Sequence, residues 1–312
     1  MINLTFSGES NFKSKEIITN NIFRIFIFYT ILSFMIFTFL SMSGIRLFNS
    51  FNLTMSLISG GGFLPSDTLR DIIVTNIQKL FLIFALFVSM LNFFLIFNLF
   101  NKKRLFNEHR EDFYLIILAV VLVLLVYLNN NDKLDIVISV ISSLSNSGIS
   151  LIKTDNNLSL YFLLITIIGG SLISNSSGIK LSRFYILIKI TSSEIIRLIS
   201  PNSVINKSIF NSDVKITDDN VKTSFLIFIS FFISIFILSS FLVFDSIGFE
   251  RSFKLSILTL TNTVNSEMYS LQNLNFNNLL ISSKLSLIIF MIIGKIELVS
   301  IFLIIKKIFF KD

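Results

Sequence analysis

Cysteine is absent from this chain of 312 residues, and histidine occurs once, as His109 in a charged segment. The lack of cysteine excludes disulfides, thiolate metal sites and cysteine nucleophiles. The apolar segments contain no HExxH pattern and no paired carboxylates, and the chain has no Walker-type or GxGxxG loop. A membrane enzyme would need such a cluster of reactive side chains. We therefore expect neither an enzyme nor a bound cofactor.

Charged residues are scarce as well. They make up 14% of the chain, against 53% hydrophobic residues, and the mean hydropathy is +0.81. Long apolar stretches with so little charge indicate an integral membrane protein. The net charge of +7 is typical of a basic cytoplasmic side, so it need not indicate nucleic acid. The first twenty residues lack the order of a cleaved signal peptide, so the first apolar segment is expected to be a retained span.

Long and short apolar segments alternate along the chain. The long ones, each near or above the roughly 20 residues that cross a bilayer, lie at about 22–43, 76–99, 113–128, 159–190, 222–244 and 283–310. The short ones, at about 46–59, 135–145 and 252–262, predict buried or re-entrant half-helices. The order span, half-helix, loop, span occurs three times, which indicates an internal repeat. We expect an all-α polytopic membrane protein with an N-terminal segment 1–20 and repeats 21–112, 113–221 and 222–312.

The charges are distributed unequally between the two sides of this arrangement. Basic residues follow the second span, the fourth span and the last span, among them Lys102, Lys103, Arg104, Arg110, Lys189, Arg197, Lys207, Lys306 and Lys307. The opposite loops are acidic, with Asp67, Asp71, Asp132, Asp135, Asp155, Asp245, Glu250 and Glu267. Basic loops stay in the cytoplasm. Both termini are then cytoplasmic and the half-helices enter from outside; each acid taken alone is equally consistent with a solvated loop residue.

Eight of the eleven glycines lie at a few points within otherwise apolar segments: Gly60, Gly61, Gly62, Gly148, Gly169, Gly170, Gly178 and Gly294. Glycine lets a backbone leave the helix or approach another group closely. Irregular backbone at membrane depth is tolerated where protein buries it or where it lines a water-filled path. The glycines therefore predict a permeation pathway.

Each half-helix is followed by a stretch that favours non-helical backbone. The three stretches are SGGGF at 59–63, SNSGI at 145–149 and TNTVN at 261–265. Extended backbone after a half-helix can direct carbonyl oxygens at one axis, where they replace the water shell of a potassium ion. The C-terminal end of a half-helix adds negative potential. The predicted cation-binding residues are Gly60, Gly61, Gly62, Asn146, Ser147, Gly148, Asn262 and Thr263, although each loop alone also fits an ordinary turn.

With these loops and three further motifs, the sequence resembles the TrkH/KtrB family of potassium uptake proteins. IGGSLISNSSGIKLSR at 168–183 resembles the family's glycine- and serine-rich broken helix. SPNSV at 200–204 resembles a segment just after it, and IGKIELVSIFL at 293–303 resembles a stretch of the last span. The resemblance runs from about residue 10 to the C-terminus. It implies a pore of linked helix–pore loop–helix repeats, each with one filter strand.

The resemblance also implies residue roles and partners. An intramembrane gate would contain Gly169, Gly170, Ser176, Ser177 and Gly178, although small residues also serve helix packing. Lys295 would project into the pore below the filter; an ion pair or snorkelling is the alternative. Lys180 and Arg183 are interpreted as membrane-edge anchors. The implied system takes up K+ or Na+ across a bacterial inner membrane, as a homodimer on a cytosolic TrkA-like ring of nucleotide-binding subunits, with 191–221 as a docking surface or a plain connecting loop.

Three features depart from the family pattern. The family has four repeats and this chain has three, and by motif order the first is missing. Val264 stands where the last filter strand should have glycine, and a β-branched residue resists a positive φ. Lys295 replaces an arginine. We therefore expect a second polypeptide to supply the first repeat; the alternative is a non-conducting truncated paralogue with an assembly role.

Overall fold

The structure, a computed structural model, describes residues 15–66, 68–92, 95, 109–127, 133–152, 156–200, 208–211, 215–271, 276 and 279–296. Its α-helices are α2 (Lys15–Met42), α3 (Leu47–Ser59), α4 (Asn76–Met90), α7 (Arg110–Tyr127), α8 (Lys133–Leu144), α9 (Asn156–Ile168), α10 (Leu181–Ile199), α11 (Asp218–Phe244), α12 (Phe249–Leu260) and α13 (Ile281–Ile296). Short 3-10 turns lie at η1 (Leu69–Asp71), η2 (Ile209–Asn211) and η3 (Glu267–Tyr269). These residues contain no β-strand, and the predicted all-α class is confirmed.

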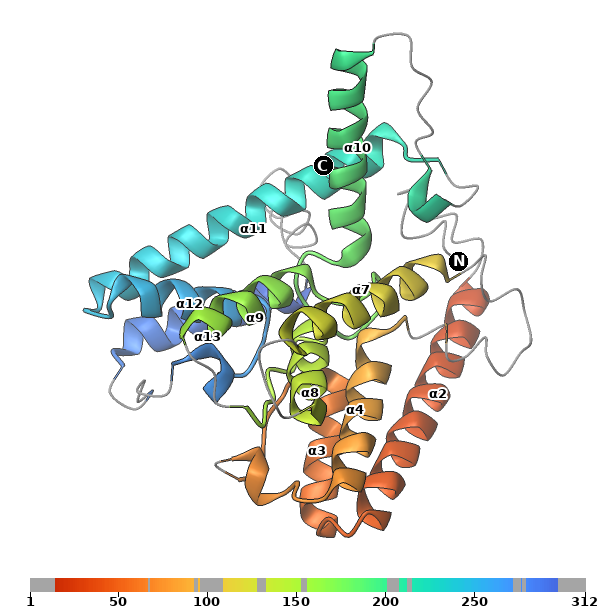
Figure 1. Ribbon diagram of the computed structural model, residues 1–312, viewed down its shortest axis with the longest axis vertical. Coiled ribbons are helices and arrows are strands. Elements are labelled where there is room, and N and C mark those ends of the chain that lie inside the picture. Colours follow the sequence, from red (N-terminus) through yellow and green to blue (C-terminus); the bar gives the residue numbers. More distant parts are fainter. Residues whose placement is uncertain are drawn as a thin grey trace.

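The order helix, half-helix, helix occurs three times, as α2–α3–α4, α7–α8–α9 and α11–α12–α13 (Figure 1). The flanking helices are longer than the half-helices except α9, which has 13 residues. The short helices α3, α8 and α12 have 13, 12 and 12 residues. At about 1.5 Å per residue they are too short for a hydrocarbon layer of about 30 Å. The three predicted half-helices are therefore present, with bounds shifted by no more than three residues from the prediction.

The predicted spans differ more from the helices. Within the described residues, only α11, with 27 residues, is long and apolar enough to cross a bilayer by itself. Shorter apolar helices occupy Phe26–Met42, Asn76–Met90 and Leu158–Ile168. Of the segment predicted at 76–99, helix α4 ends at Met90 and is followed by non-helical Leu91 and Asn92, and the segment predicted at 159–190 is interrupted between α9 and α10. The residues of the last predicted span beyond Ile296 lie outside the described part, so the six-span count stays a prediction.

Each later repeat packs its half-helix against the second long helix of the repeat before it. Thus α8 packs against α4, and α12 packs against α9. Two polar contacts join the same pairs: Lys79 Nζ lies 2.6 Å from Asp135 Oδ1, and Lys254 Nζ donates to Ser159 Oγ at 3.2 Å. As a result, nearly all of α8 and the last three turns of α12 are enclosed by protein.

The first half-helix is covered differently, because its main contacts are with α2 and α4 of its own repeat. One side of α3 carries exposed apolar side chains, which we call the α3 face: Leu47, Phe48, Phe51 and Met55. Phe48 is 72% exposed, whereas residues 138–148, in and after α8, are all buried. The α3 face is therefore the one place where a half-helix of this molecule is open along its length in the described residues.

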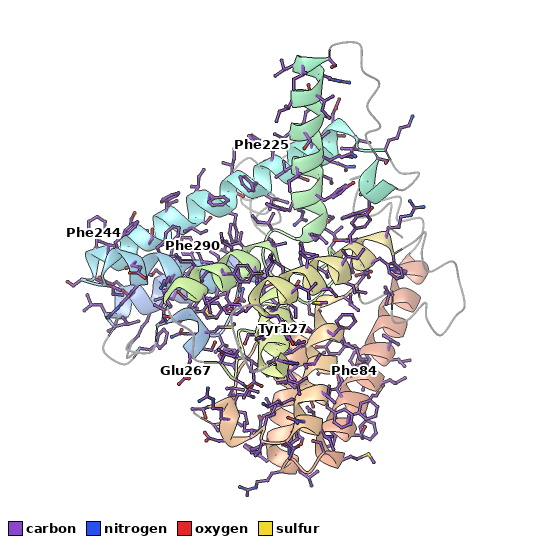
Figure 2. All side chains as sticks on the ribbon, viewed as in Figure 1. Phe84, Tyr127, Phe225, Phe244, Glu267 and Phe290 are labelled. Atoms are coloured by element: carbon purple, nitrogen blue, oxygen red, sulfur yellow. The ribbon has the colours of Figure 1, made fainter. Side chains whose placement is uncertain are left out.

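Large apolar side chains also cover the outer surface of the long helices. Phe225 and Phe244 on α11 and Phe84 on α4 are exposed, and Figure 2 shows them on the periphery. An exposed apolar surface of this kind suits a lipid environment. The core lies beneath it, where Leu82 and Ile136 are fully buried.

Candidate functional site

The loops after the three half-helices begin with the same backbone conformation. The first loop residue of each has a positive φ: 65° at Gly60, 59° at Asn146 and 51° at Asn262. The N–H of this residue donates to the carbonyl three residues back: Gly60 to Leu57, Asn146 to Ser143 and Asn262 to Thr259. The N–H of the following residue donates to the carbonyl five residues back: Gly61 to Ser56, Ser147 to Ser142 and Thr263 to Leu258. The N–H groups are thus used within the half-helix ends, so the loop carbonyls are the groups left to face elsewhere.

The third residue distinguishes the last loop from the other two. Gly62 has a φ of 68° and Gly148 a φ of 73°, whereas Val264 is not among the residues with a positive φ. A β-branched side chain resists that conformation. The expected effect of Val264 on the backbone is therefore present in the structure.

The loops lie side by side in chain order. A β-carbon built on Gly62 would overlap the carbonyl oxygen of Ser147, and one on Gly148 would overlap that of Val264. Asparagine side chains fix two of the loops to long helices: Asn146 Nδ2 donates to Thr166 O at 2.8 Å, and Asn262 Nδ2 donates to Met291 O at 2.9 Å. The structure therefore brings together all eight predicted filter residues.

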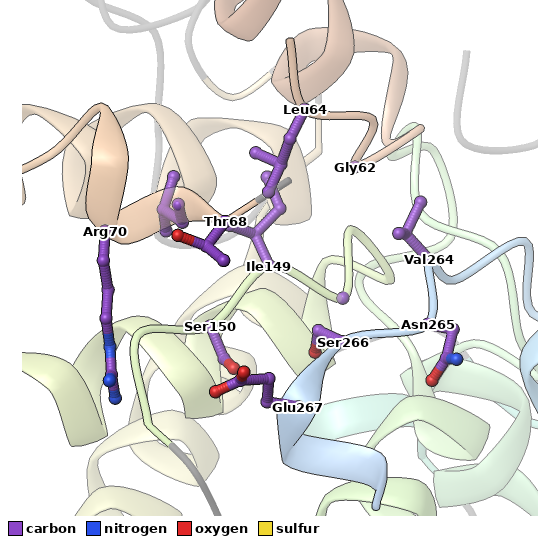
Figure 3. Close-up of a pocket in the computed structure, with 12 residues that line it drawn as sticks. Gly62, Leu64, Thr68, Arg70, Ile149, Ser150, Val264, Asn265, Ser266 and Glu267 are labelled. Atoms are coloured by element: carbon purple, nitrogen blue, oxygen red, sulfur yellow. The ribbon is translucent and has the colours of Figure 1, made fainter. Parts of the chain in front are cut away.

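A cavity of about 370 Å³ lies directly beyond the loops and is lined by all three repeats (Figure 3). Gly62, Gly148 and Val264 form one part of its wall, and Arg70 and Glu267 contribute charged groups. The Arg70 guanidinium is bound to the carbonyl of Leu151, at 3.0 Å from Nε and 2.6 Å from Nη2. The cavity is an opening through which an ion could reach the loops.

Residues 169–180, between α9 and α10, leave the helix as a loop that we call the gate segment. The N–H groups of Ile179 and Lys180 bond the carbonyls of Ile167 and Ile168, both at 3.0 Å, so helical bonding resumes across the loop. Gly169 and Gly178 have φ values of 72° and 83°. A β-carbon on Gly169 would overlap the carbonyl of Ser177, so only glycine fits there. The predicted break in this helix is present.

The remaining predicted gate residues stabilise the loop internally or hold its tip. The N–H of Gly170 donates to Ser176 Oγ at 2.9 Å. At the tip, Asn175 Nδ2 donates to Ile58 O at 2.6 Å. Lys295 Nζ donates to Asn175 O at 2.9 Å and to Ser59 O at 3.0 Å. Lys295 therefore joins α13, the gate segment and the end of α3, next to the first loop.

The membrane-edge interpretation is wrong for Lys180. Its side chain is only 4% exposed, and Nζ donates to Ser174 O at 3.2 Å and to Ser176 O. Burial among these carbonyls makes it part of the gate segment. The sequence contained no sign of this, because a lysine near the end of an apolar run is equally consistent with snorkelling.

One residue of the site was missed by the sequence analysis. Glu111, in the first turn of α7, accepts the N–H of Leu172 at 2.8 Å and the N–H of Ser182 at 3.2 Å. It lies in a run of charged residues predicted to be cytoplasmic, and no sequence feature distinguishes it from the other charged residues there. Two of the family-like stretches are placed only in part, because residues 201–204 and 297–303 lie outside the described residues.

Three loops after half-helices, arranged in order beside one opening, define a polytopic helical membrane protein of pore-loop architecture. The chain has the fold of the potassium transporter TrkH from Vibrio parahaemolyticus, with a TM-score of 0.82 and 18% identity over 95% of this chain and 66% of that one. It is 26% identical over 291 residues to the uncharacterized cation transporter MJ1485 of Methanocaldococcus jannaschii, covering 92% of this chain. No family model matches the chain.

The chain spans 59% of the length of the archaeal relative and 66% of the TrkH chain. Both similar proteins are transporters by name, and neither comparison points to an enzyme. The similarity shows that the chain has a TrkH-like fold, that of a polytopic helical membrane protein.

Proposed function

We propose that this chain is the pore-forming subunit of a system that takes up potassium, or sodium, across a bacterial inner membrane. The observation that carries the proposal is the order of the three loops, with Gly62 against Ser147 and Gly148 against Val264. Their N–H groups bond within the half-helices, so carbonyl oxygens are available to replace the water shell of a cation. The C-terminal ends of three half-helices add negative potential at the same place.

The filter in this proposal consists of Gly60, Gly61, Gly62, Asn146, Ser147, Gly148, Asn262 and Thr263. The gate lies below it and consists of Gly169, Gly170, Ser176, Ser177, Gly178 and Lys295. Lys295 places a cation beside the end of α3, where it donates to Ser59 O. In a narrow path of low dielectric constant, this charge repels a permeating cation. Flux would require the ammonium group and the tip of the gate segment to move.

We further propose that a fourth helix–half-helix–helix unit completes the three described repeats. In the described repeats, α8 is covered by α4 and α12 by α9. By the same relation, the second long helix of a further unit would cover the α3 face, which is exposed here. That unit would also complete the ring of loops between Val264 and Gly62. Exposed filter carbonyls would otherwise face lipid, at a cost of several kcal/mol each.

The proposed assembly is a homodimer that docks a cytosolic, TrkA-like nucleotide-binding subunit. The far end of α10 supports a docking role, because Leu198 and Ile199 are 85% and 77% exposed at its last turn. Figure 1 shows this helix projecting from the main body of the molecule. Of the segment predicted at 191–221, residues 191–199 belong to α10.

The test is growth of a potassium-uptake-deficient bacterial host on limiting potassium, together with rubidium uptake. The chain, co-expressed with a fourth unit, should restore both, and Gly148→Ser should abolish the effect at equal expression. A second candidate function is a non-conducting assembly role, favoured by the altered conformation at Val264. Failure of every co-expressed combination to restore uptake, with the complex present in the membrane, would favour this second function.

A further inference from the structure

Two backbone N–H groups, one in the gate segment and one just after it, bond to the same side chain of another element. Glu111 Oε1 accepts the N–H of Leu172, near the start of the segment, at 2.8 Å. The same oxygen accepts the N–H of Ser182, in the first turn of α10, at 3.2 Å. A carboxylate in this place stabilises the free N–H groups at the beginning of a helix, as an N-cap side chain does.

The contacts with Glu111 replace the hydrogen bonds of a continuous helix. In an unbroken helix, Ser171 and Leu172 would donate to Ile167 and Ile168. Those carbonyls instead accept from Ile179 and Lys180. The N–H of Ser171 goes to Met90 O at 3.1 Å, and that of Leu172 goes to Glu111. The looped-out conformation therefore depends on acceptors from α4 and α7.

We propose that Glu111 is the positioning residue that holds the gate segment looped out in the ion path. The inference rests on the proposed function, since it assigns control of the gate to a side chain on another repeat. Glu111 lies one residue after the start of α7, which follows a basic segment predicted to be cytoplasmic. A movement of the start of α7 would shift Glu111 and, with it, the N–H groups of Leu172 and Ser182 that it holds. The position of α7 therefore regulates the gate.

A matched control lies beside Glu111 in the same turn. Asp112 is fully buried and also accepts a backbone N–H, that of Asn92 at 2.8 Å. Asn92 follows α4 and is not part of the gate segment. Removing either carboxylate disturbs the beginning of α7, but only the loss of Glu111 frees the gate segment.

The experiment measures hydrogen exchange over residues 169–182 in the purified full chain in lipid nanodiscs. Glu111→Ala removes the acceptor of two backbone N–H groups and leaves both unsatisfied, so exchange of this segment should rise about tenfold or more. Glu111→Gln keeps an oxygen acceptor and should leave exchange close to that of the wild type. Glu111→Asp, whose side chain is one methylene shorter, should give an intermediate increase. This milder variant keeps the test available if the alanine protein does not fold.

The control and the flux measurement separate the outcomes. Asp112→Ala should raise exchange near Asn92 and leave 169–182 unchanged. Equal exchange of 169–182 in the wild type and Glu111→Ala would overturn the proposal, as would equal increases in Glu111→Ala and Asp112→Ala. Rubidium flux of the complex should rise with Glu111→Ala; faster exchange with unaltered flux would overturn the control of the gate. A wild-type complex without flux would contradict the proposed function, while the exchange result would still decide whether Glu111 positions the segment.

Discussion

At the scale of single residues, two glycines of the filter loops leave no space for a side chain. At Gly62 and Gly148 the space is occupied by a carbonyl oxygen of the next loop, and both have a positive φ. A side chain at either position would therefore both displace a neighbouring carbonyl and strain the backbone. These two effects can be separated, because Gly44 has a φ of 89° with open space around it.

We expect Gly62→Ser and Gly148→Ser to change or abolish ion selectivity, because each displaces an oxygen that would bind the ion. Competition between rubidium, sodium and potassium uptake measures this. Gly44→Ser imposes the backbone strain without the crowding and should retain wild-type selectivity. Wild-type transport by both filter variants would show that these loops are not the filter.

Lys295 offers a second prediction at this scale. Removing its ammonium group in Lys295→Ala should raise passive cation flux, since the barrier charge and both contacts with Asn175 and Ser59 are lost. Lys284→Ala, on the same helix, serves as the control and should leave flux unchanged. Unaltered flux with normal expression of Lys295→Ala would instead support snorkelling.

The sequence revealed these residues unevenly. Glycines in apolar segments and a lysine within a span are rare enough to indicate function, and Lys295 does lie beside the gate segment. Glu111 and Lys180 carry charges at the edges of apolar segments, where charge is common. Their contacts with backbone groups depend on the tertiary fold, so a sequence pattern could not single them out.

At the scale of elements, length alone predicted the half-helices, because a short apolar segment cannot cross a bilayer. It did not predict where the long helices end. The helix α4 ends at Met90, whose carbonyl accepts the N–H of Ser171 in the gate segment. The apolar sequence continues past this point, whereas the contacts at the end of the helix, from Met90 O to Ser171 and from the Asn92 N–H to Asp112, are made with another repeat.

The packing of α13 on α12 gives a prediction for an element. A β-carbon on Gly294 would overlap the carbonyl oxygen of Leu260, so Gly294→Ala should force the two helices apart. Overpacking of this kind costs about 1–3 kcal/mol, which thermal unfolding in detergent would detect as a lower melting temperature. Ile289→Ala lies on an exposed part of the same helix and should change the melting temperature much less. Equal melting temperatures for the wild type and Gly294→Ala would contradict the close approach.

At the scale of the whole molecule, the charge pattern predicts which side of the membrane each loop occupies. The absence of cysteine makes single-cysteine labelling simple. Cysteines at positions 67 and 155 should react with an impermeant reagent added outside intact cells, because their loops are predicted to be external. Cysteines at 103 and 307 should react only after permeabilisation. Labelling of the latter pair in intact cells would reverse the topology.

The α3 face gives a second prediction at this scale. Co-expression with a small membrane protein of one helix–half-helix–helix unit should yield a complex that survives detergent extraction and restores uptake. Phe48→Ser with Phe51→Ser should weaken that complex, because these exposed side chains would pack in the interface. Phe34→Ser, at an exposed position of α2, should not. Selective potassium conduction by the purified chain alone in liposomes would refute the need for another unit.

The packing of α8 on α4 and of α12 on α9 also bears on how the chain is made. When α8 or α12 emerges from the ribosome, the helix that it packs against has already been synthesised, because that helix belongs to the preceding repeat. Chains fold largely from the N-terminus during synthesis. Each repeat can therefore provide the packing surface for the half-helix of the next one, and the repeats can fold in the order in which they are synthesised. Within the described residues α3 has no such predecessor, and it packs instead on α2 and α4 of its own repeat.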